Sequence, residues 1–87
     1  MEITRTWTLS TAHISEKTAK WLDSHECTLG VIKYDYGWIV CVPERNYDMP
    51  KDLEILIDYA RENNIDDIKL DSDGSIENFL KTYEWDD

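Results

Sequence analysis

Residues 48–73 read DMPKDLEILIDYARENNIDDIKLDSD, and this stretch contains the clearest helical pattern of the 87-residue chain. Four apolar residues share the i, i+3, i+4, i+7 spacing that places side chains on one face of a helix: Leu53, Leu56, Ile57 and Ala60. Pro50 suits the first helical position, and Asn63-Asn64 suits a C-terminal stop. The residues that follow predict a short last strand with Ile65, Ile68 and Leu70, and then a turn over residues 71–74.

The residues before this stretch predict a strand, a helix and a hairpin. Residues 3–9 alternate between Thr and larger side chains, which is typical of a half-buried strand. Ser15 is a suitable N-cap for a short helix from Glu16 to about His25. Two runs rich in β-branched and aromatic residues, 29–34 and 38–42, are joined by a Gly-containing connection and predict a hairpin.

The predicted order of elements is β-α-β-β-α-β. This order is that of a small α+β, ferredoxin-like sandwich, in which an antiparallel sheet carries two helices on one face. We expect residues 1–87 to form this single acidic domain. The last residues predict a short helical turn and an ordered tail, because they include apolar side chains to pack: Ile76, Phe79, Leu80, Tyr83 and Trp85. The fold alone implies no function.

The net charge of −10 is concentrated in one half of the chain. Residues 1–47 hold six acids and five bases, whereas residues 48–87 hold thirteen acids and four bases, a net charge of −9. Such an excess disfavours nucleic acid and anionic membranes as direct partners, and it favours a basic protein surface. The four Trp and five Tyr argue against a disordered acidic chain.

The sequence also bears on the compartment. No apolar run approaches the ~18 residues of a membrane span, and the N-terminus lacks the basic-then-apolar order of a signal peptide. We therefore expect a cytoplasmic protein. Cys27 and Cys41 stand in no metal or redox spacing, so reduced thiols are the simpler interpretation and a disulfide between them is the alternative.

Seven carboxylates of the acidic half form the candidate partner-binding surface: Glu54, Asp58, Glu62, Asp66, Asp67, Asp71 and Asp73. The first three lie at i, i+4 and i+8, so they line up along a helix with about 6 Å between neighbours. Like charges at this spacing cost a helix a few tenths of a kcal/mol per pair, and a basic partner would relieve that repulsion. The other interpretation is a solvated surface that confers solubility, with Arg61 as a local partner of Asp58.

Three patterns suggest chemistry, and each has a simpler explanation. A calcium loop around residues 71–74 would lack ligating acids at its first and twelfth positions, so these residues predict a turn. His25 and Cys27 are close in sequence, but side chains so placed rarely meet as base and nucleophile, and two ligands fall short of a zinc site. We expect neither metal nor cofactor. For His13, a structural role that orients its turn is favoured over a role in a site.

Aromatic residues are a second indication of an interface. Tyr and Trp are enriched at binding hot spots, and Tyr34, Tyr36 and Trp38 crowd the predicted hairpin. Trp7 and Trp38 are assigned to packing, whereas Tyr36 at the turn is expected to be exposed and joins the partner-binding candidates. Aromatic binders of single-stranded nucleic acid also need a basic groove, which this sequence lacks.

Short motifs along the chain resemble a known bacterial family. They are Leu9-Ser10-Thr11-Ala12-His13-Ile14, Thr18-Ala19 with Leu22, Gly37-Trp38, Pro50 with Leu53, Tyr59-Ala60-Arg61, Asp71-x-Asp73-Gly74 and Tyr83-x-Trp85. From about Leu9 to Trp85 the chain is similar to an uncharacterised domain-of-unknown-function family that is found on mobile elements near antirestriction genes. Leu80-Lys81 departs from a Leu-Pro step in the family pattern. The resemblance implies an anti-defence setting, without a mechanism or functional residues to transfer.

These observations support three hypotheses. The first is a non-enzymatic anti-defence inhibitor, anti-CRISPR or antirestriction, that acts as a DNA mimic on a basic nucleic-acid-binding protein such as a defence nuclease or effector. The second is a generic accessory module that binds a host or plasmid protein without imitating DNA, with a homodimer through a sheet edge or the hairpin aromatics as one form of it. The third is catalytic and would require a pocket that joins His13 to a carboxylate or a thiol.

Overall fold

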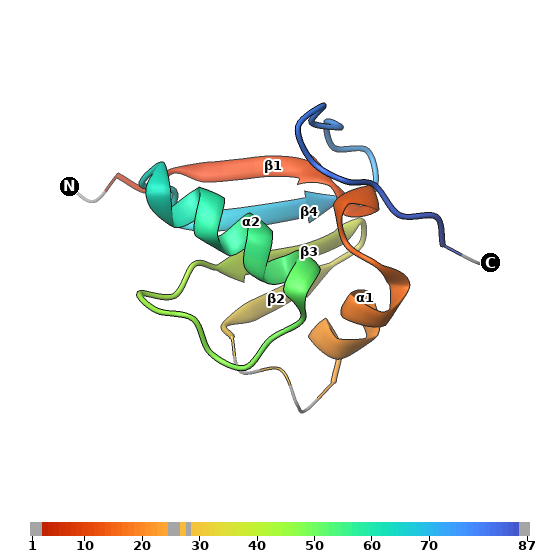
Figure 1. Cartoon of the computed structure of the whole chain (residues 1–87), viewed down its shortest axis with the longest axis horizontal. Coiled ribbons are helices and arrows are strands. Elements are labelled where there is room, and N and C mark those ends of the chain that lie inside the picture. The colour runs from red at the N-terminus through yellow and green to blue at the C-terminus, as the bar shows by residue number, and fades with distance from the viewer. Residues whose placement is uncertain (1–2, 25–26, 28, 86–87) are drawn as a thin grey trace.

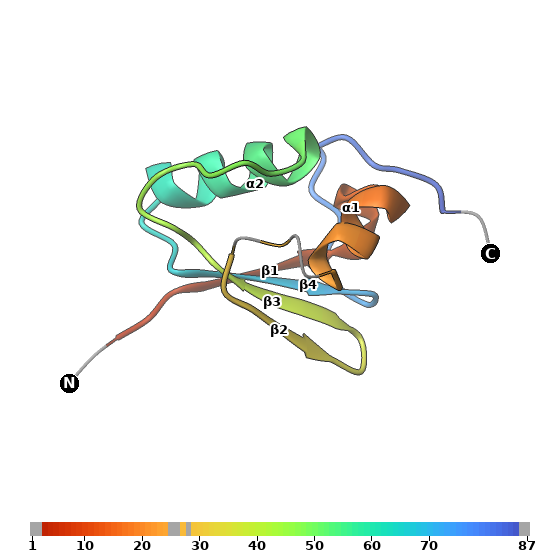
Figure 2. The same ribbon diagram turned by 90° about the horizontal axis from the view of Figure 1, so that it is seen from below.

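The computed structural model describes residues 3–24, 27 and 29–85. Its elements follow in the order β1 (Thr6–Ser10), α1 (Glu16–Leu22), β2 (Val31–Tyr34), β3 (Gly37–Cys41), α2 (Lys51–Glu62) and β4 (Asp67–Asp71), with a 3-10 turn at Thr11–His13 between β1 and α1. The four strands form one sheet, and both helices cover the same face of it (Figure 1 and Figure 2). The predicted α+β class, the order of elements and the placement of the helices on one face are confirmed.

The sheet is mixed, which corrects the expected antiparallel sheet. Its strand order is β1-β4-β3-β2, and β1 runs parallel to β4 while the other pairs are antiparallel. In a ferredoxin-like sheet the first strand lies inside, between the third and the last, whereas here β1 lies at the edge. The inner place suits β4 because Ile68 and Leu70 are completely buried, and β1 carries exposed Thr6 and Thr8. Alternation in a sequence identifies the buried face of a strand but not its neighbour.

The predicted helix of the acidic half is α2, and its ends are well defined. Pro50 lies just before the helix as its N-cap, one residue earlier than expected, and Asn63 is the C-cap. Asn64 adopts a left-handed backbone with φ of 57°, its N–H bonds to the Arg61 carbonyl, and the Ile65 N–H bonds to the Ala60 carbonyl. This pair of hydrogen bonds is a Schellman motif, which explains why Asn63-Asn64 stops the helix.

Several predicted boundaries shift, and the hairpin strands are Val31–Tyr34 and Gly37–Cys41 instead of 29–34 and 38–42. The first strand begins at Thr6, so Ile3 lies outside it and is highly exposed. Helix α1 ends at Leu22, although Ser15 caps it as predicted by accepting a hydrogen bond from the Thr18 N–H. The described tail contains a turn at residues 77–80 but no helix, and hydrogen bonds to the body of the domain hold it instead.

The core lies between the sheet and the two helices. Alternate residues of the strands meet the inward faces of α1 and α2 there, as the periodicities of strand and helix require. The buried apolar residues are Leu9, Ile14, Ala19, Leu22, Trp38, Val40, Leu53, Leu56, Ile57, Ala60, Ile68 and Leu70. The opposite face of the sheet has no covering layer within the described chain (Figure 2). This one-sided burial determines which carboxylates reach solvent and on which side.

Candidate partner-binding surface

Helix α2 places three of the predicted carboxylates on its outer side. The helix buries its apolar face against the sheet, so the row Glu54, Asp58 and Glu62, which we call the α2 row, turns outward. The Glu54 side chain is 28% exposed and lies 3.8 Å from the Lys51 ammonium, and that of Asp58 is 48% exposed. Glu62 is exposed at the C-terminal end of the helix. The predicted row therefore exists and reaches solvent.

Asp58 also holds a loop. Its Oδ1 accepts hydrogen bonds from Asn46 Nδ2 at 3.0 Å and from Arg61 at 3.5 Å. Arg61 in turn donates to the Asn46 side chain at 2.7 Å and to the Pro43 carbonyl at 3.1 Å. Asp58 and Arg61 are thus local partners, as predicted, and together they fix the loop between β3 and α2. Asp58 is the member of the α2 row with a structural task.

Asp66 and Asp67 lie where the chain enters β4. Asp66 is exposed, and its carboxylate accepts a hydrogen bond from the Arg5 N–H at 2.9 Å. Asp67 alternates with the buried Ile68, so its side chain is on the open face of the sheet, where it meets Cys41. Burial raises the pKa of the Cys41 thiol, and the charge of Asp67 and a hydrogen bond to it raise it further. A raised pKa keeps the thiol protonated, and a protonated thiol is a poor nucleophile.

Asp71 is tied into the sheet. It accepts a hydrogen bond from the Tyr34 hydroxyl at 2.7 Å and another from the Asp73 N–H at 2.8 Å. These two bonds, that of Tyr34 first, lower the pKa of Asp71, with a smaller contribution from the charge of Lys69. Burial and then the hydrogen bond and charge of Asp71 raise the pKa of Tyr34 to about 12. Asp71 therefore joins β4 to β2 across β3.

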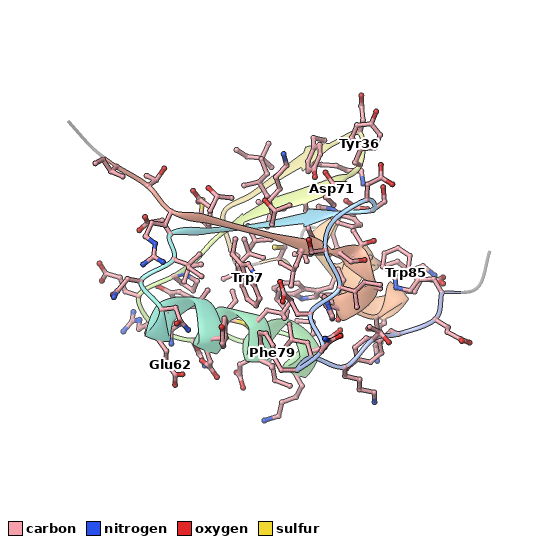
Figure 3. All side chains as sticks on the ribbon, turned by 90° about the horizontal axis from the view of Figure 1, so that it is seen from above. Trp7, Tyr36, Glu62, Asp71, Phe79 and Trp85 are labelled. Atoms are coloured by element: carbon pink, nitrogen blue, oxygen red, sulfur yellow. The ribbon has the colours of Figure 1, made fainter. Side chains whose placement is uncertain are left out.

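The seven carboxylates do not share one face. The α2 row lies on the helix side of the sheet, and Asp66 follows at the end of α2. Asp67 and Asp71 lie on the opposite face, and Asp73 is exposed in the turn after β4. Figure 3 shows Glu62 on α2 and, on the other side of the sheet and toward its other end, Asp71 with Tyr36. Tyr36 is 58% exposed, which confirms that prediction.

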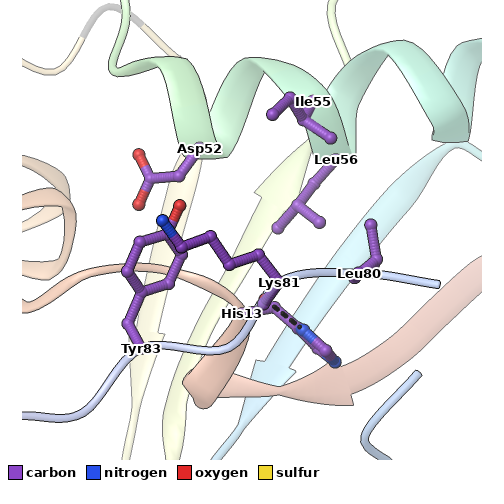
Figure 4. A pocket seen from close by; sticks show the side chains of 7 residues that line it. All are labelled: His13, Asp52, Ile55, Leu56, Leu80, Lys81 and Tyr83. Atoms are coloured by element: carbon purple, nitrogen blue, oxygen red, sulfur yellow. Dashed lines mark hydrogen bonds between the residues drawn. The ribbon is translucent and has the colours of Figure 1, made fainter. Parts of the chain in front are cut away.

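His13 is a buried clamp for the C-terminal tail. Its Nε2 accepts a hydrogen bond from the Glu77 N–H at 2.9 Å, so Nδ1 carries the ring proton and donates to the Lys81 carbonyl at 3.0 Å (Figure 4). Both nitrogens are engaged with the backbone, and the adjoining hollow of about 20 Å³ has room for about one water molecule. The predicted structural role is confirmed, but His13 orients the tail and not its own turn. The distant partners have no signal in the local sequence.

Asp52 is a second structural residue that the sequence analysis missed. Its carboxylate, in the first turn of α2, accepts hydrogen bonds from the Ser15 N–H at 2.7 Å and the Thr18 hydroxyl at 2.6 Å. These groups belong to the N-terminus of α1, where a negative charge is favourable. Asp52 therefore joins the two helices. The local signal for Asp52 is an acid in the first turn of a helix. The local sequence does not indicate that its carboxylate contacts α1.

Three aromatic rings from distant segments stack at one side of α2. The ring centroids of Trp7 and Tyr59 are 4.8 Å apart, and those of Tyr59 and Phe79 are 5.0 Å apart. Trp7 is half-buried, as expected for packing, whereas Phe79 is 58% exposed. Trp38 is buried and donates from its indole nitrogen to Asp23 at 2.8 Å, which confirms its assignment to the core. Nothing in the local sequence indicates that Tyr59 contacts Phe79.

The described residues form no metal or catalytic site at the other sequence patterns that suggested chemistry. No group of three potential metal ligands occurs in residues 3–24, 27 and 29–85. Cys27 and Cys41 are free thiols, and His25 lies outside the described residues. Residues 72–74 form the predicted turn after β4. No helix in the described part of the chain is long and apolar enough to cross a bilayer.

The fold and the surface define a small acidic α+β domain. A model described as the family of unknown function (DUF5983) C-terminal domain matches residues 6–85, and the chain belongs to this family. No curated protein and no solved structure matches the chain.

Proposed function

We propose that this protein is an acidic, non-enzymatic inhibitor that binds the basic nucleic-acid-binding surface of a defence protein as a DNA mimic. The target class is a restriction or CRISPR effector in the cytoplasm. The proposal takes its setting from the resemblance to a family found on mobile elements near antirestriction genes. Its mechanism takes support from the distribution of charge, because residues 48–87 carry a net charge of −9.

The α2 row is the observation that carries the proposal. Glu54, Asp58 and Glu62 follow one another along the outer side of a rigid helix, about 6 Å apart. This spacing is close to that of successive phosphates, and lysine and arginine contacts to phosphate supply most of the affinity of non-specific DNA-binding proteins. Asp66, exposed after the end of α2, extends the row.

The geometry restricts which acids serve as contacts. Asp67 and Asp71 lie across the sheet from the α2 row, and Asp73 lies in the turn after β4, so one basic channel that receives α2 does not reach them. Asp71 is moreover engaged by Tyr34. The proposal therefore assigns the contact to Glu54, Asp58, Glu62 and Asp66, and it assigns no reaction to the chain.

Charge reversal of the α2 row tests the proposal. The variant Glu54→Lys/Glu62→Lys changes the two members of the row that hold no loop. Tagged protein is used to capture partners from bacterial lysate, with and without excess duplex DNA as competitor. We expect the wild type to retain a nucleic-acid-binding protein that DNA displaces, and the variant to lose it, because electrostatic attraction to phosphate-binding residues is removed.

The control is Asp35→Lys/Glu44→Lys, which makes the same change in net charge at two exposed positions outside the acidic half. It is expected to retain the partner. Equal loss of the partner in both variants would mean that net charge alone accounts for the binding. A partner that stays bound in excess DNA and also binds the α2 variant would refute DNA mimicry.

A second candidate function rests on the open face of the sheet. Ile32, on the edge strand β2, is 60% exposed on this face. Tyr36, in the turn that follows β2, is 58% exposed. This surface supports an accessory module that binds another protein, or a second copy of itself, without imitating DNA. That function predicts binding that is insensitive to moderate salt and to reversal of the α2 row.

A further inference from the structure

An exposed apolar stripe runs along the seam between α2 and the tail. It consists of Ile55, Tyr59 and Phe79, whose exposed fractions are 55%, 37% and 58%. Tyr59 follows Ile55 by one helical turn, and its ring stacks on that of Phe79. Ile55 also borders the hollow beside Leu80 (Figure 4), so helix and tail are adjacent along the stripe.

The structure holds this stripe in place instead of burying it. His13 bonds to the backbone of Glu77 and Lys81, two residues to each side of Phe79, and the Leu80 N–H closes a turn on the Glu77 carbonyl. A buried histidine thus fixes the segment that presents an exposed phenylalanine (Figure 3 and Figure 4). Burying an aromatic side chain stabilises a fold, so folding alone does not favour this arrangement. Contiguous exposed apolar side chains of this kind mark interaction sites.

The stripe lies directly beside the α2 row. Residues four apart form parallel rows on a helix, so the row through Ile55 and Tyr59 is the neighbour of the row through Glu54, Asp58 and Glu62. Both segments that form the stripe, α2 and the tail, belong to the half with a net charge of −9. An occupant must therefore offer apolar side chains next to cationic ones, whereas a second copy would bring two acidic halves together.

We propose that the stripe binds a basic amphipathic helix of a partner protein. Its apolar side chains pack on Ile55, Tyr59 and Phe79 at i, i+3/i+4 and i+7 spacing, and its Lys and Arg face the α2 row. This inference rests on the proposed function, because it uses the same carboxylates. It adds the partner's chemistry, since the partner must offer apolar side chains as well as positive charge.

Two synthetic peptides test the inference by fluorescence anisotropy. Each has about 18 residues, or five helical turns. The first combines Leu on one face with Lys on the other, and the second replaces every Leu with Ser. We expect Phe79→Ser and Ile55→Ser each to weaken binding of the Leu/Lys peptide about tenfold, a larger loss than most interface side chains give, and to leave binding of the Ser/Lys peptide unchanged.

Matched controls come from the open face. Ile32→Ser and Tyr36→Ser remove side chains as exposed as Ile55 and Phe79, and we expect both to bind the Leu/Lys peptide as the wild type does. Far-ultraviolet circular dichroism establishes that each variant is folded. The charge variant Glu54→Lys/Glu62→Lys should weaken binding of both peptides.

Three results would overturn the inference: equal affinity for both peptides, equal losses in the stripe and control variants, or a dimer that Phe79→Ser converts to a monomer. The outcome is separable from that of the proposed function. Loss of Leu/Lys peptide binding in the stripe variants without any DNA-displaceable partner would support the stripe and refute the mimicry. An α2-dependent, DNA-displaceable partner with unaffected peptide binding would do the reverse.

Discussion

The carboxylates of α2 and those of β4 are alike in kind but differ in what they contact. On the outer side of α2, Glu54 and Glu62 reach solvent, and the Glu54 carboxylate lies 3.8 Å from the ammonium of Lys51 on the same helix. On β4, Asp71 accepts hydrogen bonds from Tyr34 and from the turn that follows it. A count of acids therefore overstates a binding surface, because part of the charge serves the fold.

Asp52 shows that the division does not simply follow secondary structure. It lies on α2, as Glu54 does, yet its carboxylate turns toward α1 and accepts two short hydrogen bonds. The helix thus carries one acid that holds the domain together, one that holds a loop, and two that face outward. Substitutions at these positions should separate the two kinds of carboxylate.

The largest effect is expected from Asp52→Ala. The change removes the acceptor of the Ser15 N–H and the Thr18 hydroxyl, and hydrogen bonds to charged groups contribute about 1.5–3 kcal/mol each. Allowing for water that replaces part of the contact, we expect the free energy of unfolding to fall by about 2–3 kcal/mol. Urea denaturation measures it.

Glu54→Ala is the matched control for Asp52→Ala, because both acids lie in the first turn of α2. It removes an ion pair with the highly exposed Lys51 and a favourable charge at the helix N-terminus, so its cost should stay below about 1 kcal/mol. Equal losses in the two variants would show that Asp52 acts only as a helix-end charge and does not join α1 to α2.

An intermediate effect is expected in the ionisation of Tyr34. Its pKa is raised from 10.0 to about 12, so its contribution to stability is complete below pH 10 and is lost as the pH rises toward 12. In Asp71→Asn the charge of Asp71 is absent and its hydrogen bond is weaker, while burial, the largest cause, remains. We expect the pKa of Tyr34 to fall part of the way toward 10.0.

The ultraviolet absorbance of the phenolate follows this titration. Tyr34→Phe should remove the latest of the tyrosine transitions and so identify it, and circular dichroism should show that the fold persists through the measurement. A Tyr34 transition unchanged by Asp71→Asn would mean that Asp71 is not its partner in solution, and the contrast between the bound and the solvent-facing acids would lose its best example.

The sequence predicts much of the fold because its signals are local. The apolar face of α2, the Asn63-Asn64 stop and the Ser15 cap each depend on residues within one or two helical turns, and the structure confirms them. The parallel pairing of β1 with β4 was missed because it joins residues about sixty positions apart. Periodicity indicates a buried face, but the neighbour of a strand depends on the packing of the whole sheet.

The candidate surface divides in the same way. The α2 row follows from helical spacing alone, and so its exposure was predictable. The separation of Asp71 from that row, the clamp at His13 and the stack of Tyr59 on Phe79 all depend on tertiary contacts between distant segments. The local sequence does not indicate these contacts, because the partner of each residue lies elsewhere in the chain.

The smallest effect, and the one opposite in sign, is expected from Glu62→Gln. Glu62 lies at the C-terminal end of α2, where a negative charge opposes the helix dipole, and it follows Asp58 by four residues. Removing its charge should raise the free energy of unfolding by a few tenths of a kcal/mol at low salt, and the gain should shrink as salt screens the charges. Asp71→Asn removes the same charge but should destabilise the domain. Urea denaturation of both variants at two salt concentrations makes the comparison, and a loss of stability in Glu62→Gln would mean that the α2 row, like Asp71, serves the fold.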